Sequence, residues 1–119
     1  MHVMDEDATR LRLRILFGSN AMLGPGKAEL LEHIRDTGSI TAAGAAMGMS
    51  YKRAWSLVET LNATFREPVV VTARGGVKGG GAQLTETGLA VLAHYRRIED
   101  LLREVGADDL AALRALLAE

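Results

Sequence analysis

The chain has 119 residues, a formal net charge of −1, 48% hydrophobic residues and no cysteine. This length allows one domain with a single core, so a catalytic domain joined to a regulatory domain is excluded. No apolar run is long enough to span a membrane, and residues 1–7 are acidic rather than typical of a signal peptide. We therefore expect a cytoplasmic protein.

Neither a metal centre nor an enzyme active site is expected. The lack of cysteine excludes disulfides and thiolate ligands, and His2, His33 and His94 are far apart in the sequence. No histidine is paired with a plausible nucleophile, and no two carboxylates have a spacing typical of acid–base catalysis. The sequence therefore predicts a protein without catalysis and without a cofactor.

Residues 9–17 are expected to form a strand, because their side chains alternate between apolar and basic with the period of a half-buried strand. The apolar set is Leu11, Leu13 and Ile15, and the basic set is Arg10, Arg12 and Arg14. The basic face has three open uses: contact with phosphates, solvation, or pairing with acidic residues of a partner subunit. We favour the last two.

A loop over residues 18–26, which contains Gly, Asn and Pro, is expected to follow. An amphipathic helix is then predicted over residues 27–37. It would place Leu30, Leu31 and Ile34 on one apolar face and end at Gly38, because glycine readily takes the positive φ of a helix terminus.

Residues 39–65 are predicted to form two helices joined by a tight turn at Gly48. Ser39 or Thr41 can cap the first helix, and Ser50 can cap the second. The first helix is rich in alanine, which allows two helices to cross closely, and Met47 and Met49 are expected to point inward from the turn. These are the features of a helix-turn-helix, although an ordinary helical hairpin in a core remains an alternative.

The second of these helices has one apolar face, and its opposite face is predicted to be free. The apolar positions have helical spacing and comprise Ala54, Leu57, Val58, Leu61 and Phe65. The free face begins at the N-terminal turn, where backbone N–H groups and the positive end of the helix dipole point outward. The candidate DNA contacts there are Ser50, Tyr51, Lys52, Arg53, Trp55 and Ser56.

Residues 69–84 are predicted to form a β-hairpin, the wing, with a glycine-rich tip. Its candidate DNA contacts are Arg74, Lys78, Gly79 and Gly80. The loop is not a nucleotide-binding P-loop, because no hydroxyl follows Lys78 and the loop leads into a strand. A hairpin tip rich in glycine instead suits close approach to a DNA phosphate or minor groove, and a surface hairpin without a partner is the alternative.

Residues 85–118 are predicted to be helical, with an interruption at Gly106 and Asp108 as a cap for the last helix. They carry more apolar surface than a small core can cover, which is typical of an interface. The predicted homodimer contacts are Leu89, Leu92, Tyr95, Ile98, Leu102, Val105 and Leu113. The competing interpretation is that these helices fold back on their own domain.

Two motifs carry a resemblance to a known family. They are S-Y-K-R-A-W at residues 50–55 and G-G-V-K-G-G-G-A-Q-L-T-E-T-G at residues 75–88. With the order of predicted elements, they resemble the DNA-binding domain of ModE, the molybdate-responsive transcriptional regulators, which is related to the LysR-type domain. The resemblance implies a mainly α-helical fold with a small β wing, a winged helix-turn-helix with a long C-terminal dimerisation helix, over residues 1–119.

The resemblance also implies a function: a homodimer that binds double-stranded DNA at a pseudo-palindromic operator. It places the motif helix in the major groove, with Trp55 either at DNA or packed against the root of the wing. ModE proteins usually carry a molybdate-binding region, and we expect it to be absent here, because the sequence ends with a helix where that region would begin. The resemblance therefore leaves two inputs open: another signal, or a separate effector-binding protein.

A hypothesis of another class is a non-catalytic interaction module that heterodimerises with a full-length regulator through its C-terminal helices. The net charge near zero favours it. Against it, the stretch from Tyr51 to Gln83 has five basic and two acidic residues, a balance of +3. We favour the DNA-binding regulator, because positive charge gathers on the elements that would face DNA.

Overall fold

The computed structural model describes residues 9–73 and 81–118. Its elements, in chain order, are β1 (Ile15–Phe17), β2 (Ala21–Leu23), α1 (Pro25–Thr37), α2 (Ile40–Ala46), α3 (Tyr51–Thr64), β3 (Val70–Ala73), β4 (Gly81–Leu84), α4 (Glu86–Val105) and α5 (Ala107–Ala115). The strands form two antiparallel pairs, β1–β2 and β3–β4. The prediction of a mainly helical chain with a small β component is confirmed.

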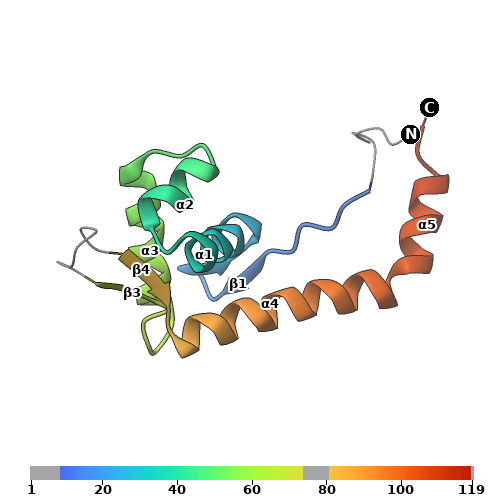
Figure 1. Ribbon diagram of the computed structural model, residues 1–119. Coiled ribbons are helices and arrows are strands. Elements are labelled where there is room, and N and C mark those ends of the chain that lie inside the picture. The colour runs from blue at the N-terminus through green and yellow to red at the C-terminus, as the bar shows by residue number, and fades with distance from the viewer. Residues whose placement is uncertain (1–8, 74–80, 119) are drawn as a thin grey trace.

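The molecule consists of a packed body and a projecting arm, with extents of 55 × 38 × 22 Å (Figure 1). The body contains α1, α2, α3 and the β3–β4 hairpin. The arm is the second half of α4 with α5, and the extended residues before β1 run beside it. No helix of the described ranges is long and apolar enough to cross a membrane.

The core lies between α1, α2, α3, the two hairpins and the first half of α4. Leu30, Leu31 and Ile34 are fully buried, as predicted for the inner face of α1. This helix begins at Pro25, two residues before the predicted start, because proline at the first position presets φ and lacks the N–H that would be unpaired there. It ends at Gly38, whose φ of 73° is the left-handed value expected.

The N-terminal strand prediction was partly wrong. Only Ile15–Phe17 is a strand, and it pairs with Ala21–Leu23, which lies inside the predicted loop. Gly18, with φ of 70°, turns the chain between them. Residues 9–14 keep the predicted alternation, with half-buried leucines and exposed arginines, but no strand in the described part of the chain gives them ladder hydrogen bonds.

The C-terminal helices divide at Gly106 as predicted, but two details differ. Gly106 and not Asp108 is the N-cap of α5, and it makes no side-chain cap bond. Asp108 lies in the first helical turn, where its charge is favourable to the helix dipole. Leu92 and Tyr95 are 3% and 1% exposed, so these predicted dimer contacts belong to the domain's own core.

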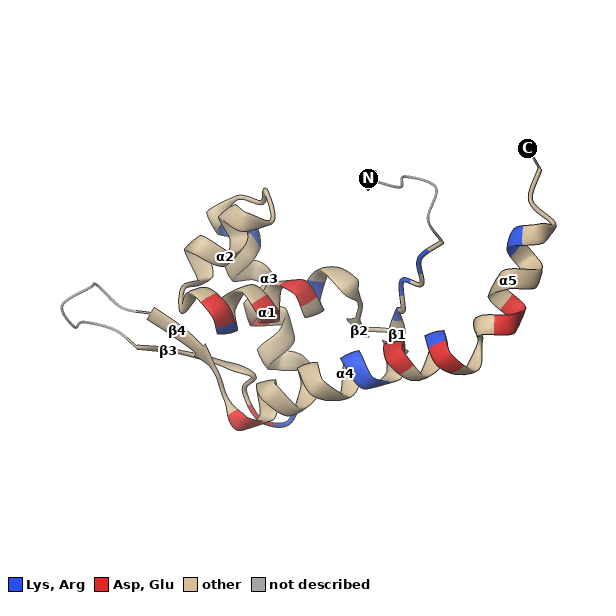
Figure 2. Cartoon of the chain, turned by 45° about the vertical axis from the view of Figure 1, so that its right-hand side comes forward, with Lys and Arg blue, Asp and Glu red and all other residues tan. Residues whose placement is uncertain are grey.

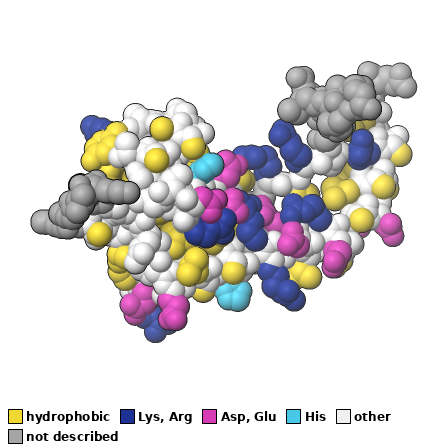
Figure 3. All heavy atoms as spheres, viewed as in Figure 1, with side chains coloured by type: hydrophobic (Ala, Val, Ile, Leu, Met, Phe, Trp, Pro, Cys, Tyr) yellow, Lys and Arg dark blue, Asp and Glu magenta, His cyan; other side chains and the backbone are white. Residues whose placement is uncertain are grey.

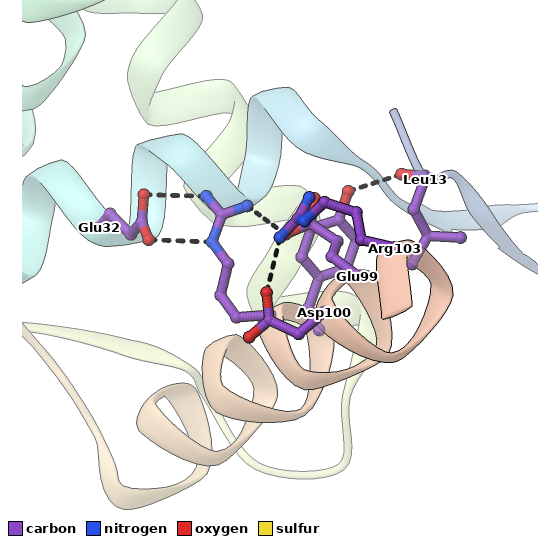
Figure 4. A network of polar contacts seen from close by, with 7 residues as sticks. Leu13, Glu32, Glu99, Asp100 and Arg103 are labelled. Carbon is purple, nitrogen blue, oxygen red and sulfur yellow. Dashed lines mark hydrogen bonds and ion pairs between the residues drawn. The ribbon is translucent and has the colours of Figure 1, made fainter. Parts of the chain in front are cut away.

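A polar network fixes α4 against α1 and the N-terminal segment (Figure 4). The guanidinium of Arg96 donates to Glu32 of α1 and to the buried carboxylate of Glu99. The hydroxyl of Tyr95 donates to the carbonyl of Leu13 at 2.5 Å. Three segments far apart in the sequence are therefore joined at the base of the arm.

Candidate nucleic-acid interface

The α2–α3 pair crosses closely because a glycine faces an alanine at the crossing. A Cβ at Gly44 would lie 2.8 Å from the Cβ of Ala54, closer than carbon atoms pack. Ser39 caps α2 by accepting from Ala42 N at 3.0 Å, and Gly48 has the positive φ of 70° that the predicted turn requires. Met47 and Met49 pack against the core on either side of that turn, as predicted.

The first turn of α3 is presented to solvent. Ser50 caps the helix, as predicted, with Oγ accepting from Arg53 N at 3.0 Å. Tyr51 is 62% exposed, and Lys52 and Arg53 are also exposed. On the opposite side Ala54, Val58 and Leu61 are buried, while Leu57 and Phe65 are half-buried. Ser56 lies on the exposed side, so five of the six candidate contacts are accessible.

Trp55 is the sixth candidate, and it is half-buried. Its ring packs against the core and lies 6.1 Å from the ring of Tyr51, with the planes tilted by 57°. The indole Nε1 is buried and has no hydrogen-bond partner among the described residues. This placement favours packing over DNA contact, because the one polar atom of the side chain points away from solvent.

Lys27 of α1 adds a cation that sequence patterns did not indicate. Its ammonium donates to the carbonyl of Met22 at 3.0 Å. Partial burial lowers the pKa of Lys27, and the positive charge of Arg53 lowers it further. The start of α1 therefore reinforces the positive field at the start of α3.

The β3–β4 hairpin is tied to the end of α3 by one asparagine. Asn62 Oδ1 accepts from Val69 N at 2.8 Å and from Val70 N at 3.0 Å, while Nδ2 donates to Val70 O at 3.1 Å. The strands pair from Val70↔Leu84 to Ala73↔Gly81. Sequence reasoning missed this role of Asn62, because its partners lie beyond the helix.

The same hairpin is held from below by α4. A Cβ at Gly88 would lie 2.1 Å from the carbonyl oxygen of Val69, so only glycine allows this approach. Thr85 caps α4 by accepting from Gly88 N at 2.9 Å, and its hydroxyl donates to Pro68 O at 2.7 Å. The base of the hairpin is thus fixed from two sides. The predicted tip contacts Arg74, Lys78, Gly79 and Gly80 lie outside the described residues.

Apolar side chains of α4, α5 and the residues after α5 are exposed to solvent. The five remaining predicted dimer contacts are Leu89 at 47%, Ile98 at 39%, Leu102 at 43%, Val105 at 81% and Leu113 at 61%. Leu101, Leu116 and Leu117, which are not among the seven predicted contacts, are 42%, 80% and 70% exposed. The nine-residue α5 has no buried residue at all. This surface is apolar enough to be an interface.

Within residues 9–73 and 81–118, no group of three or more His, Asp or Glu side chains is arranged to hold a metal ion. The features that the structure brings together are instead the exposed turn of α3, the cation of Lys27 and the base of a hairpin. An exposed helix start flanked by basic side chains suits an extended anionic partner.

No family model matches the chain. The chain is similar in sequence to three curated proteins. The molybdenum transport protein ModE of Azotobacter vinelandii is 35% identical over 123 aligned positions, 92% of this chain and 46% of that protein. The molybdenum-pterin-binding protein MopB of Rhodobacter capsulatus is 42% identical over 94 aligned positions, which cover 79% of this chain and 35% of MopB. The DNA-binding transcriptional dual regulator ModE of Escherichia coli K12 is 34% identical over 98 aligned positions, which cover 79% of this chain and 37% of the regulator.

The chain spans less than half the length of these relatives. By name, these relatives are a molybdenum transport protein, a molybdenum-pterin-binding protein and a DNA-binding transcriptional dual regulator. This similarity supports a relationship between the chain and the ModE family.

Proposed function

We propose that this chain is a sequence-specific, double-stranded DNA-binding regulator that acts as a homodimer in the cytoplasm, without a cofactor and without catalysis. The observation that carries the proposal is the exposed, polar first turn of α3, which lies on the surface of the body beside the close α2–α3 crossing. The ModE relatives named as DNA-binding and transcriptional regulators support it.

In this proposal α2 and α3 form a helix-turn-helix, and α3 enters the major groove. Lys52, Arg53 and Tyr51 read base edges, because their side chains are exposed at the start of the helix. Ser50 and Lys27 lie beside them and bind phosphates. The helix dipole adds to the attraction, since its positive end points the same way.

The β3–β4 hairpin is proposed to act as a wing. Its base is held by Asn62 and by the close packing on Gly88. Arg74 and Lys78 would contact phosphates from the tip, with Gly79 and Gly80 allowing the backbone to approach the duplex. These contacts position the protein without reading sequence.

The homodimer is proposed to form through the exposed apolar surface of the arm. Solvent exposure of seven large apolar side chains after Tyr95, in α4, α5 and the residues that follow α5, is unfavourable, and a second copy would bury them; they are Ile98, Leu101, Leu102, Val105, Leu113, Leu116 and Leu117. If the two α3 helices of the homodimer contact half-sites one turn apart, their separation should be about 34 Å.

The test is selection of bound sequences from random duplex DNA at a stated salt concentration. An enriched inverted repeat is expected. Lys52→Ala should weaken binding to that repeat more than binding to random duplex. Lys78→Ala should weaken both equally and reduce the salt slope by about one unit. Arg97→Ala is the matched control, since Arg97 is exposed on α4 away from α3. Lack of any enrichment by folded, dimeric protein would contradict the proposal.

A second candidate function is an interaction module that uses the arm to heterodimerise with a full-length regulator. The exposure of Leu116 and Leu117, at 80% and 70%, favours it as much as it favours a homodimer. Sedimentation of the purified chain, alone and with a full-length regulator, separates the two. A stable homodimer that does not exchange with the regulator supports the leading proposal.

A further inference from the structure

Tyr51 is an exposed aromatic residue at the point where α3 is proposed to meet DNA. It is the first residue of this helix and is 62% exposed. Within the fully described stretch of residues 25–64, it is the one large hydrophobic side chain that is exposed. Figure 3 shows hydrophobic side chains next to a basic one at the upper left of the body, where Figure 1 places the start of α3. Because an apolar ring in water is unfavourable, a contact that covers this ring would be stabilising.

The ring of Tyr51 lies against Trp55, one helical turn further along α3. The two ring centroids are 6.1 Å apart and the planes are tilted by 57°, within the range of about 4.5–7 Å for favourable aromatic pairs. Helical side chains lean toward the N-terminus, so Trp55 leans toward Tyr51. Trp55 is itself half-buried and packs against the core, with its indole Nε1 buried. A ring anchored in the core therefore restricts Tyr51, which then loses less conformational freedom when it binds a partner.

The charged neighbours of Tyr51 in the chain are cations. Between Thr37 and Val58 the charged residues are Lys52 and Arg53, and both are exposed. Figure 2 accordingly shows blue and no red on the ribbon of α2 and the start of α3. In the major groove, the two cations suit phosphates and the acceptor atoms of base edges, whereas Tyr51 presents the apolar face of a ring. The apolar group that a base edge offers there is the C5 methyl of thymine.

We propose that Tyr51 reads the C5 methyl group of one thymine in each half-site, and that Trp55 is a positioning residue that holds the Tyr51 ring in place. This inference rests on the proposed DNA-binding function and names the base that one residue of α3 selects. It assigns the readout to the ring of Tyr51 and not to its hydroxyl. Lys52 and Arg53 are then left for the acceptor groups of other bases.

Deoxyuridine substitution tests the proposal, because uracil pairs as thymine does and lacks only the methyl group. The probe is the inverted repeat enriched from random duplex, with one thymine at a time replaced at the matching position of both half-sites. Fluorescence anisotropy measures the affinity at one stated salt concentration. At one position, loss of the methyl group should weaken binding about fourfold for each half-site.

Variants assign this effect to a side chain through the ratio of the affinities for the thymine and uracil duplexes. Tyr51→Ala should bring the ratio to about one, whereas Tyr51→Phe keeps the ring and should keep the ratio of the parent. Trp55→Leu keeps apolar packing without an aromatic support and should lower the ratio, and Trp55→Phe should retain it. Lys52→Ala is the control, because it should weaken binding to both duplexes and leave the ratio unchanged.

The contrary outcomes are distinct. An enriched repeat in which no thymine is sensitive to loss of its methyl group would overturn this inference and leave the proposed DNA binding intact. A ratio that persists in Tyr51→Ala would assign the methyl group to another residue, and a ratio lost in Tyr51→Phe would assign the readout to the hydroxyl. An unchanged ratio in Trp55→Leu would remove the positioning role of Trp55. Absence of any enriched repeat would overturn the inference together with the proposed function.

Discussion

Arg96 on α4 and Glu32 on α1 form a two-pronged ion pair, from Nε to Oε2 at 2.9 Å and from Nη2 to Oε1 at 2.8 Å. The third guanidinium nitrogen, Nη1, donates to Glu99 Oε1 at 2.6 Å. The bond to Glu32 is the main cause that raises the pKa of Arg96. Because α1 packs against both α2 and α3, this pair sets the direction of the arm relative to the proposed DNA-reading helix.

Arg96→Met should lower the free energy of unfolding by about 3 kcal/mol, because Glu99 is 6% exposed and would lose its partner. Glu32→Gln should cost only about 1 kcal/mol, since its side chain is 32% exposed and the amide oxygen still accepts. Urea unfolding measures both. The control Arg103→Gln breaks the exposed pair with Asp100 and should stay within about 0.5 kcal/mol. Equal losses in Arg96→Met and Arg103→Gln would show that burial of Glu99 is unimportant.

Gly44→Ala should push α2 and α3 apart, because the new Cβ would lie 2.8 Å from that of Ala54. Overpacking of this kind costs about 1–3 kcal/mol, and DNA affinity should fall as α3 shifts. Ala54→Gly alone should cost about 1 kcal/mol through helix propensity. The double variant restores the space between the two helices. Its loss of unfolding free energy should therefore be smaller than the sum of the losses of the two single variants. Strict additivity in urea unfolding would refute a steric origin.

Asn62→Ala should detach the hairpin from α3, because the N–H groups of Val69 and Val70 would lose their acceptor inside the protein. A loss of about 2 kcal/mol is expected in urea unfolding. Asn62→Asp keeps the acceptor and loses only the donor to Val70 O, so it should cost less. Asn62 is half-buried at the base of the hairpin, so it would not contact DNA itself. Weaker DNA binding by a folded Asn62→Ala protein would therefore show that the placement of the hairpin matters. If both variants were as stable as the parent, the role of Asn62 in holding the hairpin to α3 would be refuted.

Local features of the chain were predictable because they depend on neighbours in sequence. The caps of Ser39 and Ser50, the turn at Gly48 and the buried face of α1 follow from side-chain oxygens, positive φ and helical spacing. The exposed turn of α3 follows from the same spacing. For the described part of the candidate interface, this local information placed five of six residues on the accessible side.

Features that join distant segments were not predictable. Arg96 and Glu32 are 64 residues apart, and nothing in the spacing of either marks the other as its partner. The same limit explains the errors at Leu92 and Tyr95. Periodicity identified an apolar face on α4, but it cannot tell which part of that face the domain's own core covers and which part is left for a partner.

Tyr95 should make stability depend on alkaline pH. Its hydroxyl donates to Leu13 O at 2.5 Å, and burial, followed by the charge of Glu99, raises its pKa above the ordinary 10.0. The folded state therefore holds this proton more tightly than the unfolded chain does. Its contribution is complete below pH 10 and is lost as pH rises through the raised pKa. Tyr95→Phe should be less stable by about 1 kcal/mol at pH 7, because Leu13 O loses its donor. Between pH 10 and 11 its urea midpoint should fall less steeply than that of the parent, and parallel curves would contradict the raised pKa.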